Sequence, residues 1–317
     1  MRGYSVFFYG EAKSGKTTIA TKFPNHLLLA FEKGYNAIPG AMAMPINSWS
    51  EFKKALRQLK DEKVKAKFET IVVDTADIAY DYCEKYICSN NGVDTIGDIP
   101  YGKGFKLAAK EYDEAFRAIL QMNYGLVLIS HATDKTFKDQ NGQEYNQIVP
   151  TLDNKPRNIV SRMADIIGYS RVIDLPEGGT QPMLFMRGTP RFIAGSRFKY
   201  TPEVIPFNYQ SLVDAICDAI DRQAEEDGGQ YFTEEASNLH LTGAKELDFD
   251  DLMAEFNNIL NILVNNSEDD TFTTYWQPRV TQVIETYLGK GMKVSQCTRD
   301  QVEALDLIVS DLKEFIK

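Results

Sequence analysis

The residues best suited to chemistry lie within the first 17 positions of the sequence. Residues 10–17 read GEAKSGKT and fit the pattern G-x-x-x-x-G-K-[ST] at every required position. Glycines at these places let the backbone wrap around an anion, so that successive N–H groups face phosphate oxygens. Lys16 would add a compact positive charge, and the hydroxyl of Thr17 is a ligand that Mg²⁺ accepts. A glycine turn that fits by chance is the alternative.

The surroundings of this pattern support the same interpretation. A short apolar strand is expected over residues 4–9 and a helix over residues 16–22, which is the strand–loop–helix order of phosphate-binding loops. We therefore expect ATP with Mg²⁺ as the ligand. The residues predicted to contact the nucleotide are Gly10, Ala12, Lys13, Ser14, Gly15, Lys16, Thr17 and Thr18.

A carboxylate at the end of another strand is expected to complete the magnesium site. Residues 70–74 (TIVVD) form a β-branched strand that ends in Asp74, and a phosphate-binding loop needs such an anchor on a neighbouring strand. Thr17 and Asp74 are therefore the predicted metal ligands. Asp74 is also suited to cap the helix that follows it, and Asp77 is the fallback ligand.

Two further polar residues end apolar strands and are candidates for catalysis together with Lys16. Glu32 closes residues 26–32, and His131 closes residues 125–131. The carboxyl ends of parallel strands form the edge at which α/β sheets bind ligands. Glu32 could there orient the attacking water, and His131 could contact the γ-phosphate and pass its presence to the next loop. A surface glutamate at a turn and a capped strand end are the alternatives.

Two cations further along the chain are candidates of a different kind. Arg197 and Lys199 lie two positions apart in GSRFKY, so on a strand their side chains would point the same way. Such a pair could reach the phosphates bound by a neighbouring subunit, as an arginine finger does. Two unrelated surface cations are the alternative.

The elements that must position these residues predict an α/β fold. Apolar strands alternate with helices over the first 131 residues, which indicates a parallel sheet with helices on both faces. Residues 136–138 and 144–149 then flank Asn141-Gly142, a strong hairpin signal. Further antiparallel strands are expected at residues 166–175, 183–187 and 191–193. The sheet should therefore begin parallel and end antiparallel.

The rest of the chain is expected to be helical and separate. We place a P-loop ATPase domain over residues 1–208 and a small acidic helical domain over residues 209–317, with a linker at about 224–230 (AEEDGGQ). A capping box at Thr298 and Gln301 marks the last helix. Helices are predicted at residues 209–222, 250–264, 280–288 and 301–316.

Charge divides the chain at the same place. The net charge is −10, but residues 1–208 hold 27 Lys/Arg and 23 Asp/Glu, whereas residues 209–317 hold 8 and 22. A mildly basic first part could meet an anionic polymer. The alternative is that the acidic second part is only a solubilising surface.

Composition argues against a membrane protein and against a zinc protein. The longest apolar runs, residues 26–31 and 125–129, are too short to cross a bilayer. No basic segment leads into an apolar signal core at the start. The four cysteines form no CxxC pair, which favours reduced thiols in a cytoplasmic protein.

With these motifs in this order, residues 1–208 resemble RecA-like recombination ATPases and, more closely, a phage family of AAA-type nucleotide-binding proteins that act in single-strand annealing. The resemblance implies a RecA-like P-loop core in which Glu32 activates water and Asp74-Thr75 follows the family pattern at the magnesium site. A polar sensor ends the next core strand, where the recombinases have glutamine and this chain has His131.

The resemblance also implies a site for single-stranded DNA. The DNA-facing loops of such proteins match residues 90–106 and 133–158, whose aromatic and basic side chains suit base stacking and phosphate contact. Arg197 and Lys199 match two cations that reach the ATP of the next subunit, which implies a homo-oligomer, either a ring or a filament. The predicted DNA-binding residues are Lys103, Lys106, Phe137, Lys138, Lys155 and Arg157.

The function expected from the sequence is ATP hydrolysis by a phage-type recombination or replication protein that acts on single-stranded DNA, in the host cytoplasm if a phage encodes it. A second hypothesis is a nucleotide-dependent switch or loader, which recruits a replication or single-strand-binding protein through the acidic helical region. A small-molecule kinase is the third, although no arginine-rich lid follows the sheet.

Overall fold

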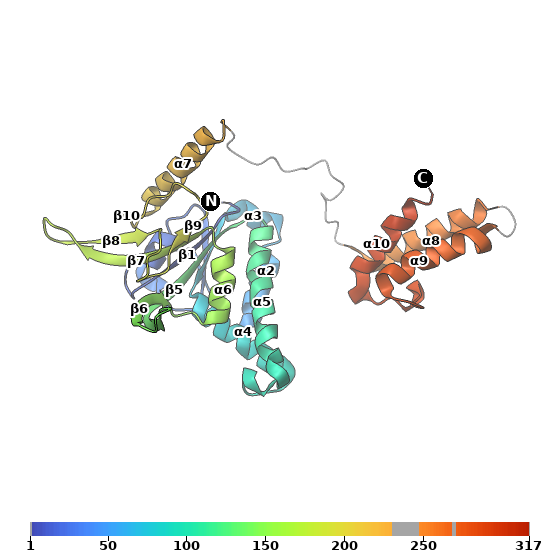
Figure 1. Ribbon diagram of the computed structural model, residues 1–317, viewed down its shortest axis with the longest axis horizontal. Coiled ribbons are helices and arrows are strands. Elements are labelled where there is room, and N and C mark those ends of the chain that lie inside the picture. Colours follow the sequence, from blue (N-terminus) through green and yellow to red (C-terminus); the bar gives the residue numbers. More distant parts are fainter. Residues whose placement is uncertain (1, 230–246, 268–270, 317) are drawn as a thin grey trace. The chain divides into compact units, whose positions relative to one another are not determined.

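The structure, a computed structural model, describes residues 2–229, 247–267 and 271–316. The chain divides into two compact units, Met1–Phe232 and Thr233–Lys317 (Figure 1). The first unit holds every residue for which the sequence predicted chemistry.

The first unit is built on one mixed sheet. Its strands lie in the order β10-β8-β7-β1-β5-β4-β2-β3, with β6 paired to β5 and β9 paired to β7. Every pairing from β7 to β3 is parallel, whereas β8 and β10 are antiparallel, so the predicted change of direction is confirmed. The strands are β1 (Ser5–Gly10), β2 (His26–Ala30), β3 (Ala43–Pro45), β4 (Thr70–Asp74), β5 (Gly125–Lys138), β6 (Glu144–Pro150), β7 (Ile166–Asp174), β8 (Thr180–Phe185), β9 (Gly195–Ser196) and β10 (Val204–Pro206).

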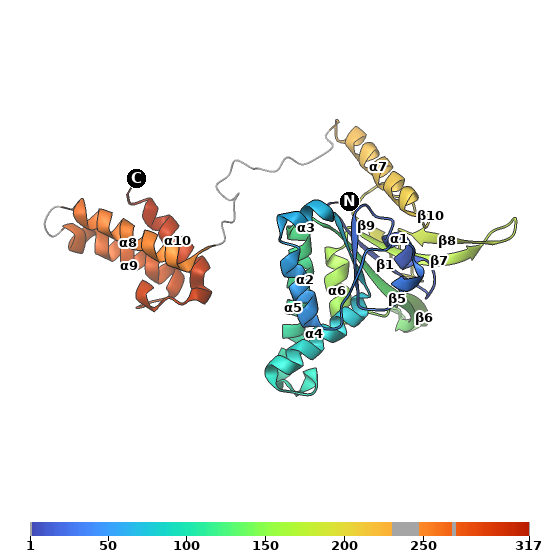
Figure 2. The same ribbon diagram turned by 180° about the vertical axis from the view of Figure 1, so that it is seen from behind.

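Helices cover both faces of the sheet, as the sequence predicted (Figures 1 and 2). Side chains alternate along β1, so Phe7 lies in the core on one face and Phe8 in the core on the other. This explains why the central strands are continuous apolar runs. The first face carries α2 (Trp49–Gln58), α4 (Ala76–Asn91), α5 (Lys103–Gln121) and α6 (Asn154–Met163), and the second carries α1 (Lys16–Ala20) and α7 (Tyr209–Glu226).

The structure moves the domain boundary behind α7. This helix buries Leu212 and Ile216 in the same core as Phe8 and Phe23, so it belongs to the first unit and not to the acidic region that was expected from residue 209. The apolar stripe of α7 predicts a buried face, but it does not say which unit buries it. The start of the predicted linker is still helical up to Glu226, and residue 230 lies outside the described residues.

Two local features differ from the prediction. The helix after the phosphate-binding loop ends at Ala20 rather than at residue 22, because Pro24 follows and disfavours helical geometry in the residue before it. Residues 191–193 form no strand. Phe192 instead makes isolated bridges to Ile148 and Thr189, and the short strand β9 lies further on.

The β5–β6 hairpin extends beyond the edge of the sheet. Its two strands pair from Ala132 opposite Pro150 to Lys138 opposite Glu144. Gly142 has φ +79° in the turn, a left-handed conformation that glycine adopts without strain. The hairpin predicted from Asn141-Gly142 is confirmed.

Over residues 247–267 and 271–316, the second unit packs three α-helices together. They are α8 (Phe249–Asn265), α9 (Gln277–Leu288) and α10 (Val302–Lys313), and their apolar sides enclose Phe256, Ile259 and Leu305. The capping box at Thr298 and Gln301 is present, at the start of a short 3₁₀ turn before α10. Among the residues described in either unit, no helix is long and apolar enough to cross a membrane.

Candidate nucleotide-binding site

The two glycines of the phosphate-binding loop serve different purposes. Gly15 has φ +88° directly before α1, where an L side chain would be strained. At Gly10 the constraint is space. A Cβ there would lie 2.2 Å from the Ser170 hydroxyl and 2.3 Å from the Ser170 carbonyl oxygen on β7. Gly10 is therefore required by the close packing of β1 against β7. Ser14 meets the same residue, with the two hydroxyl oxygens 2.9 Å apart.

Lys16 folds back onto its own loop. Its ammonium group donates to the carbonyl oxygens of Gly10 (2.9 Å) and Glu11 (2.7 Å) and to the Ser14 hydroxyl (3.3 Å). Burial lowers the pKa of Lys16 from 10.5 to about 8, against the attraction of Asp74. A phosphate group beside Lys16 would supply the negative charge that this buried cation lacks.

Thr17 and Asp74 come together as the sequence predicted. The Thr17 hydroxyl donates to Asp74 Oδ2 at 2.7 Å. Burial raises the pKa of Asp74, and the hydrogen bond from Thr17 opposes that rise. Both side chains offer hard oxygen donors, so they fit the Mg²⁺ that accompanies a nucleoside triphosphate. The cap of α4 is Thr75, whose hydroxyl accepts from the Ile78 N–H, so Asp74 does not act as that cap.

Glu32 and His131 meet across the edge of the sheet. Strand pairing places His131 beside Gly10, and the backbone N–H of Glu32 donates to the carbonyl oxygen of Asp74 at 3.1 Å. His131 Nε2 lies 3.4 Å from Glu32 Oε2. The side chains are 39% and 46% exposed, so a ligand can reach both.

These residues line one cavity of about 590 Å³. Its polar side holds Lys16, Thr17 and Asp74, while Ala37 and Ile38, at the end of a 3₁₀ turn (Tyr35–Ala37), add an apolar side. A site with both kinds of wall suits a ligand that joins phosphates to an aromatic base. The predicted residues that line it are Ala12, Lys13, Gly15, Lys16, Thr17, Thr18, Glu32, Asp74 and His131.

Sequence reasoning missed Ser170 and the apolar wall. Ser170 interrupts the apolar strand β7 with a hydroxyl at the carboxyl edge, a signal that could have found it. Ile38 lies in an irregular segment and carried no such signal.

Arg197 and Lys199 lie away from this cavity. The strand β9 ends at Ser196, so the expectation that the two side chains share one direction on a strand is wrong. The Arg197 guanidinium donates to Asp165 Oδ1 at 3.0 Å, at the amino end of the sheet. Lys199 donates instead to Glu226 Oε2 at 2.6 Å, at the end of α7.

The predicted DNA-binding residues lie on regular elements rather than on open loops. Lys103 and Lys106 are in the first turn of α5, and Lys155 and Arg157 are in the first turn of α6. The Lys155 ammonium lies 4.6 Å from the centre of the Phe105 ring, so the two segments are in contact. The pairing of apolar and cationic groups there is compatible with stacked bases and phosphates.

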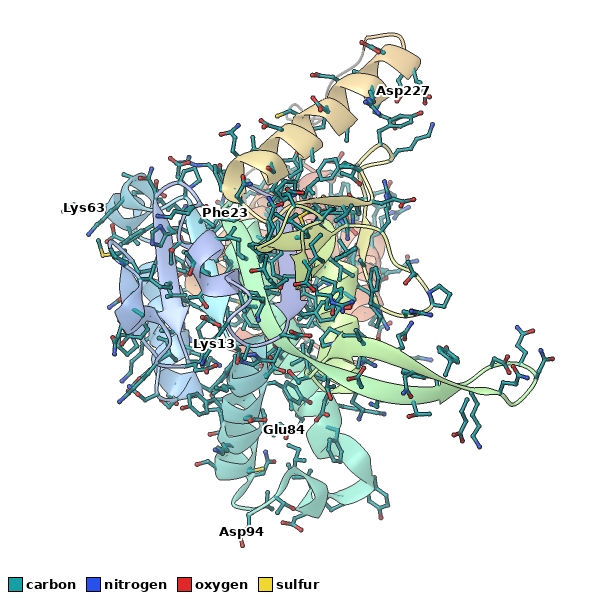
Figure 3. All side chains as sticks on the ribbon, turned by 90° about the vertical axis from the view of Figure 1, so that its left-hand side faces the viewer. Lys13, Phe23, Lys63, Glu84, Asp94 and Asp227 are labelled. Atoms are coloured by element: carbon teal, nitrogen blue, oxygen red, sulfur yellow. The ribbon has the colours of Figure 1, made fainter. Side chains whose placement is uncertain are left out.

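Phe137 and Lys138 lie on the projecting hairpin. The Phe137 ring stacks on Tyr145 across the two strands, with centroids 5.9 Å apart. Figure 3 shows the hairpin extending from the body and Asp94 at the far end of the segment between α4 and α5. Lys13 marks the phosphate-binding loop in the same view.

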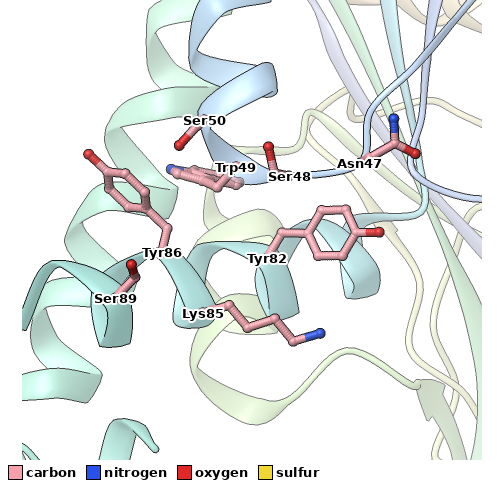
Figure 4. A pocket seen from close by; sticks show the side chains of 8 residues that line it. All are labelled: Asn47, Ser48, Trp49, Ser50, Tyr82, Lys85, Tyr86 and Ser89. Atoms are coloured by element: carbon pink, nitrogen blue, oxygen red, sulfur yellow. The ribbon is translucent and has the colours of Figure 1, made fainter. Parts of the chain in front are cut away.

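A second cavity, of about 490 Å³, lies between α4 and the start of α2 (Figure 4). Sequence reasoning did not find it, although Tyr82 and Tyr86 are spaced to share one face of a helix. The Tyr82 ring packs 5.8 Å from Phe31, the neighbour of Glu32. The cavity is lined by Asn47, Ser48, Trp49, Ser50, Tyr82, Lys85, Tyr86 and Ser89.

The sheet order, the loop around Lys16 and the Thr17–Asp74 pair define a P-loop nucleotide-binding ATPase core. Residues 2–198 match the AAA domain family, and the chain belongs to it. Over its whole length the chain is 32% identical to the SPbeta prophage-derived uncharacterized protein YorG of Bacillus subtilis (strain 168), in an alignment that covers 94% of that protein. These findings support a phage-type AAA ATPase that uses a nucleotide and, as such domains usually do, Mg²⁺.

Proposed function

We propose that this protein is a DNA-dependent ATPase of a phage-type recombination or replication module, which acts on single-stranded DNA as an oligomer in the host cytoplasm. The observation that carries the proposal is strand β5. This single strand of 14 residues passes His131 at the nucleotide cavity and continues to Phe137 and Lys138 on the hairpin. A change at the phosphates therefore has a direct structural route to a projecting arm, which carries the stacked Phe137 and Tyr145 rings and two lysines beside three carboxylates.

The chemistry follows from the positions at the carboxyl edge. Glu32 orients the attacking water and accepts its proton, as the new bond forms to the γ-phosphorus and the bond to the bridging oxygen breaks. Lys16 neutralises charge on the outer phosphates, and His131 contacts the γ-phosphate. Thr17 and Asp74 would hold Mg²⁺, which would stabilise negative charge on the phosphate oxygens.

The position of Arg197 supports a head-to-tail oligomer. It lies at the amino edge of the sheet, beside Asp165, whereas the nucleotide cavity lies at the carboxyl edge. Subunits stacked edge to edge would bring the amino edge of one to the carboxyl edge of the next, which is the heterologous contact of a ring or a filament. Arg197 and Lys199 would exchange their present acidic partners for the neighbour's phosphates.

The test is the steady-state ATPase rate of the full chain with and without oligo(dT). We expect stimulation by DNA in the wild type, loss of turnover in Lys16→Ala and Glu32→Gln, and loss of stimulation alone in Lys138→Ala. Lys63→Ala is the matched control, since Lys63 lies on the short helix α3 (Glu62–Lys67). Absence of any DNA response at low salt, where phosphate contacts are strongest, would contradict the proposal.

One observation favours a second candidate, a nucleotide-dependent switch or loader. The second unit has a core of its own, and Val264, Tyr275 and Leu307 are each about half exposed on it. Exposed apolar side chains on an acidic unit suit a protein partner. Tight ATP binding without turnover, and without a DNA response, would favour this candidate over the first.

A further inference from the structure

A carboxylate on α4 holds both strands of the hairpin where they leave the sheet. Asp77 lies in the first turn of α4, and its Oδ1 accepts from the Thr151 hydroxyl at 2.6 Å and from the Ser130 hydroxyl at 3.1 Å. Ser130 is on β5, and Thr151 directly follows β6. The root of the hairpin is therefore tied to α4 through one oxygen atom.

The same root is joined to His131 through the backbone. The Thr151 N–H donates to the His131 carbonyl oxygen at 2.9 Å, while the His131 side chain faces Glu32. A shift of His131 toward a γ-phosphate moves the peptide group that Thr151 binds. Asp74 ends β4 and Asp77 lies three residues further on, in the first turn of α4, so the predicted magnesium aspartate and the hairpin root both lie at the start of α4.

The hydrogen bonds between Asp77, Ser130 and Thr151 can be arranged in a second way. Two hydroxyls share Asp77 Oδ1, whereas Oδ2 is buried and makes no hydrogen bond with the described residues. An unpaired buried acceptor costs free energy, so an arrangement with one hydroxyl on each oxygen competes with the present one. The Ser130 and Thr151 hydroxyl oxygens are only 3.3 Å apart, which makes the exchange a small movement.

The surroundings allow that movement. Asp77 and Thr151 line a cavity of about 370 Å³ that shares Glu32 and His131 with the nucleotide cavity. Burial raises the pKa of Asp77, and the hydrogen bonds from Thr151 and Ser130 oppose the rise. The Thr17 hydroxyl pairs with Asp74, whereas Asp77 accepts from the hydroxyls of Ser130 and Thr151.

We propose that Asp77 and Thr151 are positioning residues that couple the nucleotide site to the β5–β6 hairpin. The inference rests on the proposed function in one respect: it takes the hairpin as the part that meets DNA. The coupling itself is a property of the single chain and has a readout without DNA.

The experiment compares the full-length wild type with Asp77→Asn and Thr151→Val, with Thr151→Ser as the control that keeps the hydroxyl. Amide hydrogen exchange of residues 132–150 is measured with and without a non-hydrolysable ATP analogue, and ATPase is measured with and without oligo(dT). In the wild type and Thr151→Ser, the analogue should slow exchange in the hairpin. In Asp77→Asn and Thr151→Val, this effect and the DNA stimulation should fall about tenfold, within the range of an allosteric coupling, with basal turnover retained.

The outcomes separate the inference from the proposed function. An unchanged nucleotide effect on hairpin exchange in Thr151→Val would overturn the inference, even if DNA stimulates the wild type. An equal fall of ATPase with and without DNA would also overturn it, because it would indicate a merely structural role. Loss of the exchange effect in both variants, with no DNA response in the wild type, would support the coupling and refute the proposed function. If Asp77→Asn does not fold, the double variant Ser130→Ala/Thr151→Val, which removes both hydroxyls that Asp77 binds, takes its place in the same measurements.

Discussion

The carboxylates at the two edges of the parallel sheet differ in how fully they are hydrogen-bonded. At the amino edge, Asp165 accepts from the Ser5 backbone N–H and hydroxyl and from Arg197, so its oxygens are paired. At the carboxyl edge, Asp77 keeps one buried oxygen unpaired and Asp74 has a raised pKa. Satisfied groups stabilise a fold, whereas unsatisfied ones persist where function needs them. The comparison indicates which edge does chemistry without reference to any motif.

The largest effect is expected from Glu32→Gln. The amide cannot accept the proton of the attacking water, so kcat should fall by about 10²-fold or more, while ATP affinity stays near that of the wild type. Single-turnover hydrolysis and equilibrium ATP binding measure the two quantities. Asp165→Asn, at the amino edge, should leave the kcat of the folded protein unchanged. Equal losses in the two variants would remove the functional distinction between the edges.

The next effect concerns the two loop glycines. Gly10→Ala should destabilise the protein by more than about 3 kcal/mol, because the new Cβ meets the backbone of β7. At Gly15 a new Cβ would meet only Ile19 Cδ1, at an ordinary contact distance of 4.0 Å, but the backbone is left-handed, so Gly15→Ala should cost about 1–2 kcal/mol. Urea unfolding of both variants gives the two free energies. A larger loss of unfolding free energy in Gly15→Ala than in Gly10→Ala would contradict the close packing of β1 against β7 at Gly10.

The pH dependence of ATP binding should report Lys16. Its pKa is lowered to about 8 by burial, and phosphate binding favours the protonated form, so affinity should fall above pH 8 with a limiting slope of tenfold per pH unit. In the unliganded protein the stability of the fold should change with pH in the opposite direction to ATP affinity. Deprotonation relieves a buried charge, so stability relative to Lys16→Met should rise between pH 8 and 10. Calorimetric binding from pH 7 to 9.5 is the measurement, and a flat profile would contradict the assigned environment.

The smallest effect on stability is expected from Arg197→Ala. Its pair with Asp165 is 60% exposed on the arginine side, so the loss should be below about 1 kcal/mol. Activity tests the role in the oligomer. Arg197→Ala and Lys16→Ala, each inactive alone, should recover ATPase when mixed, because the second supplies an intact Arg197 to the intact site of the first. Full ATPase activity of Arg197→Ala alone would contradict a role of Arg197 at the nucleotide of the neighbouring subunit.

Much of the site could be predicted because it follows from local sequence. The phosphate-binding loop is eight consecutive residues, Asp74 ends β4, and Glu32 follows β2 by two residues. The prediction that His131 ends its strand is wrong, because β5 continues to Lys138, but His131 does lie where the buried part of β5 ends. Parallel strands bring such ends to one edge, so their convergence needs no long-range information.

The rest depends on contacts between distant parts of the chain. Gly10 is constrained by Ser170, and Asp77 accepts hydrogen bonds from Thr151. Ser170 stands out as a hydroxyl in an apolar strand, but nothing local pairs it with Gly10, and Thr151 stands out neither by type nor by spacing. The predicted position of the domain boundary was wrong for the same reason. An amphipathic helix such as α7 shows that one face is buried, but the partner that buries it is settled only by tertiary packing.

The length of β5 has a mechanical consequence. Seven residues, Ala132 to Lys138, pair with β6 beyond His131, and at about 3.3 Å per residue they make an arm of roughly 23 Å. If the two paired strands move as one body, the arm pivots about its root. A rotation of about 5° displaces the tip by about 2 Å, more than half of the 3.4 Å rise between stacked bases. In the proposed function the hairpin would work as a lever, which would turn a sub-ångström change at the phosphates into a displacement of about 2 Å at its tip.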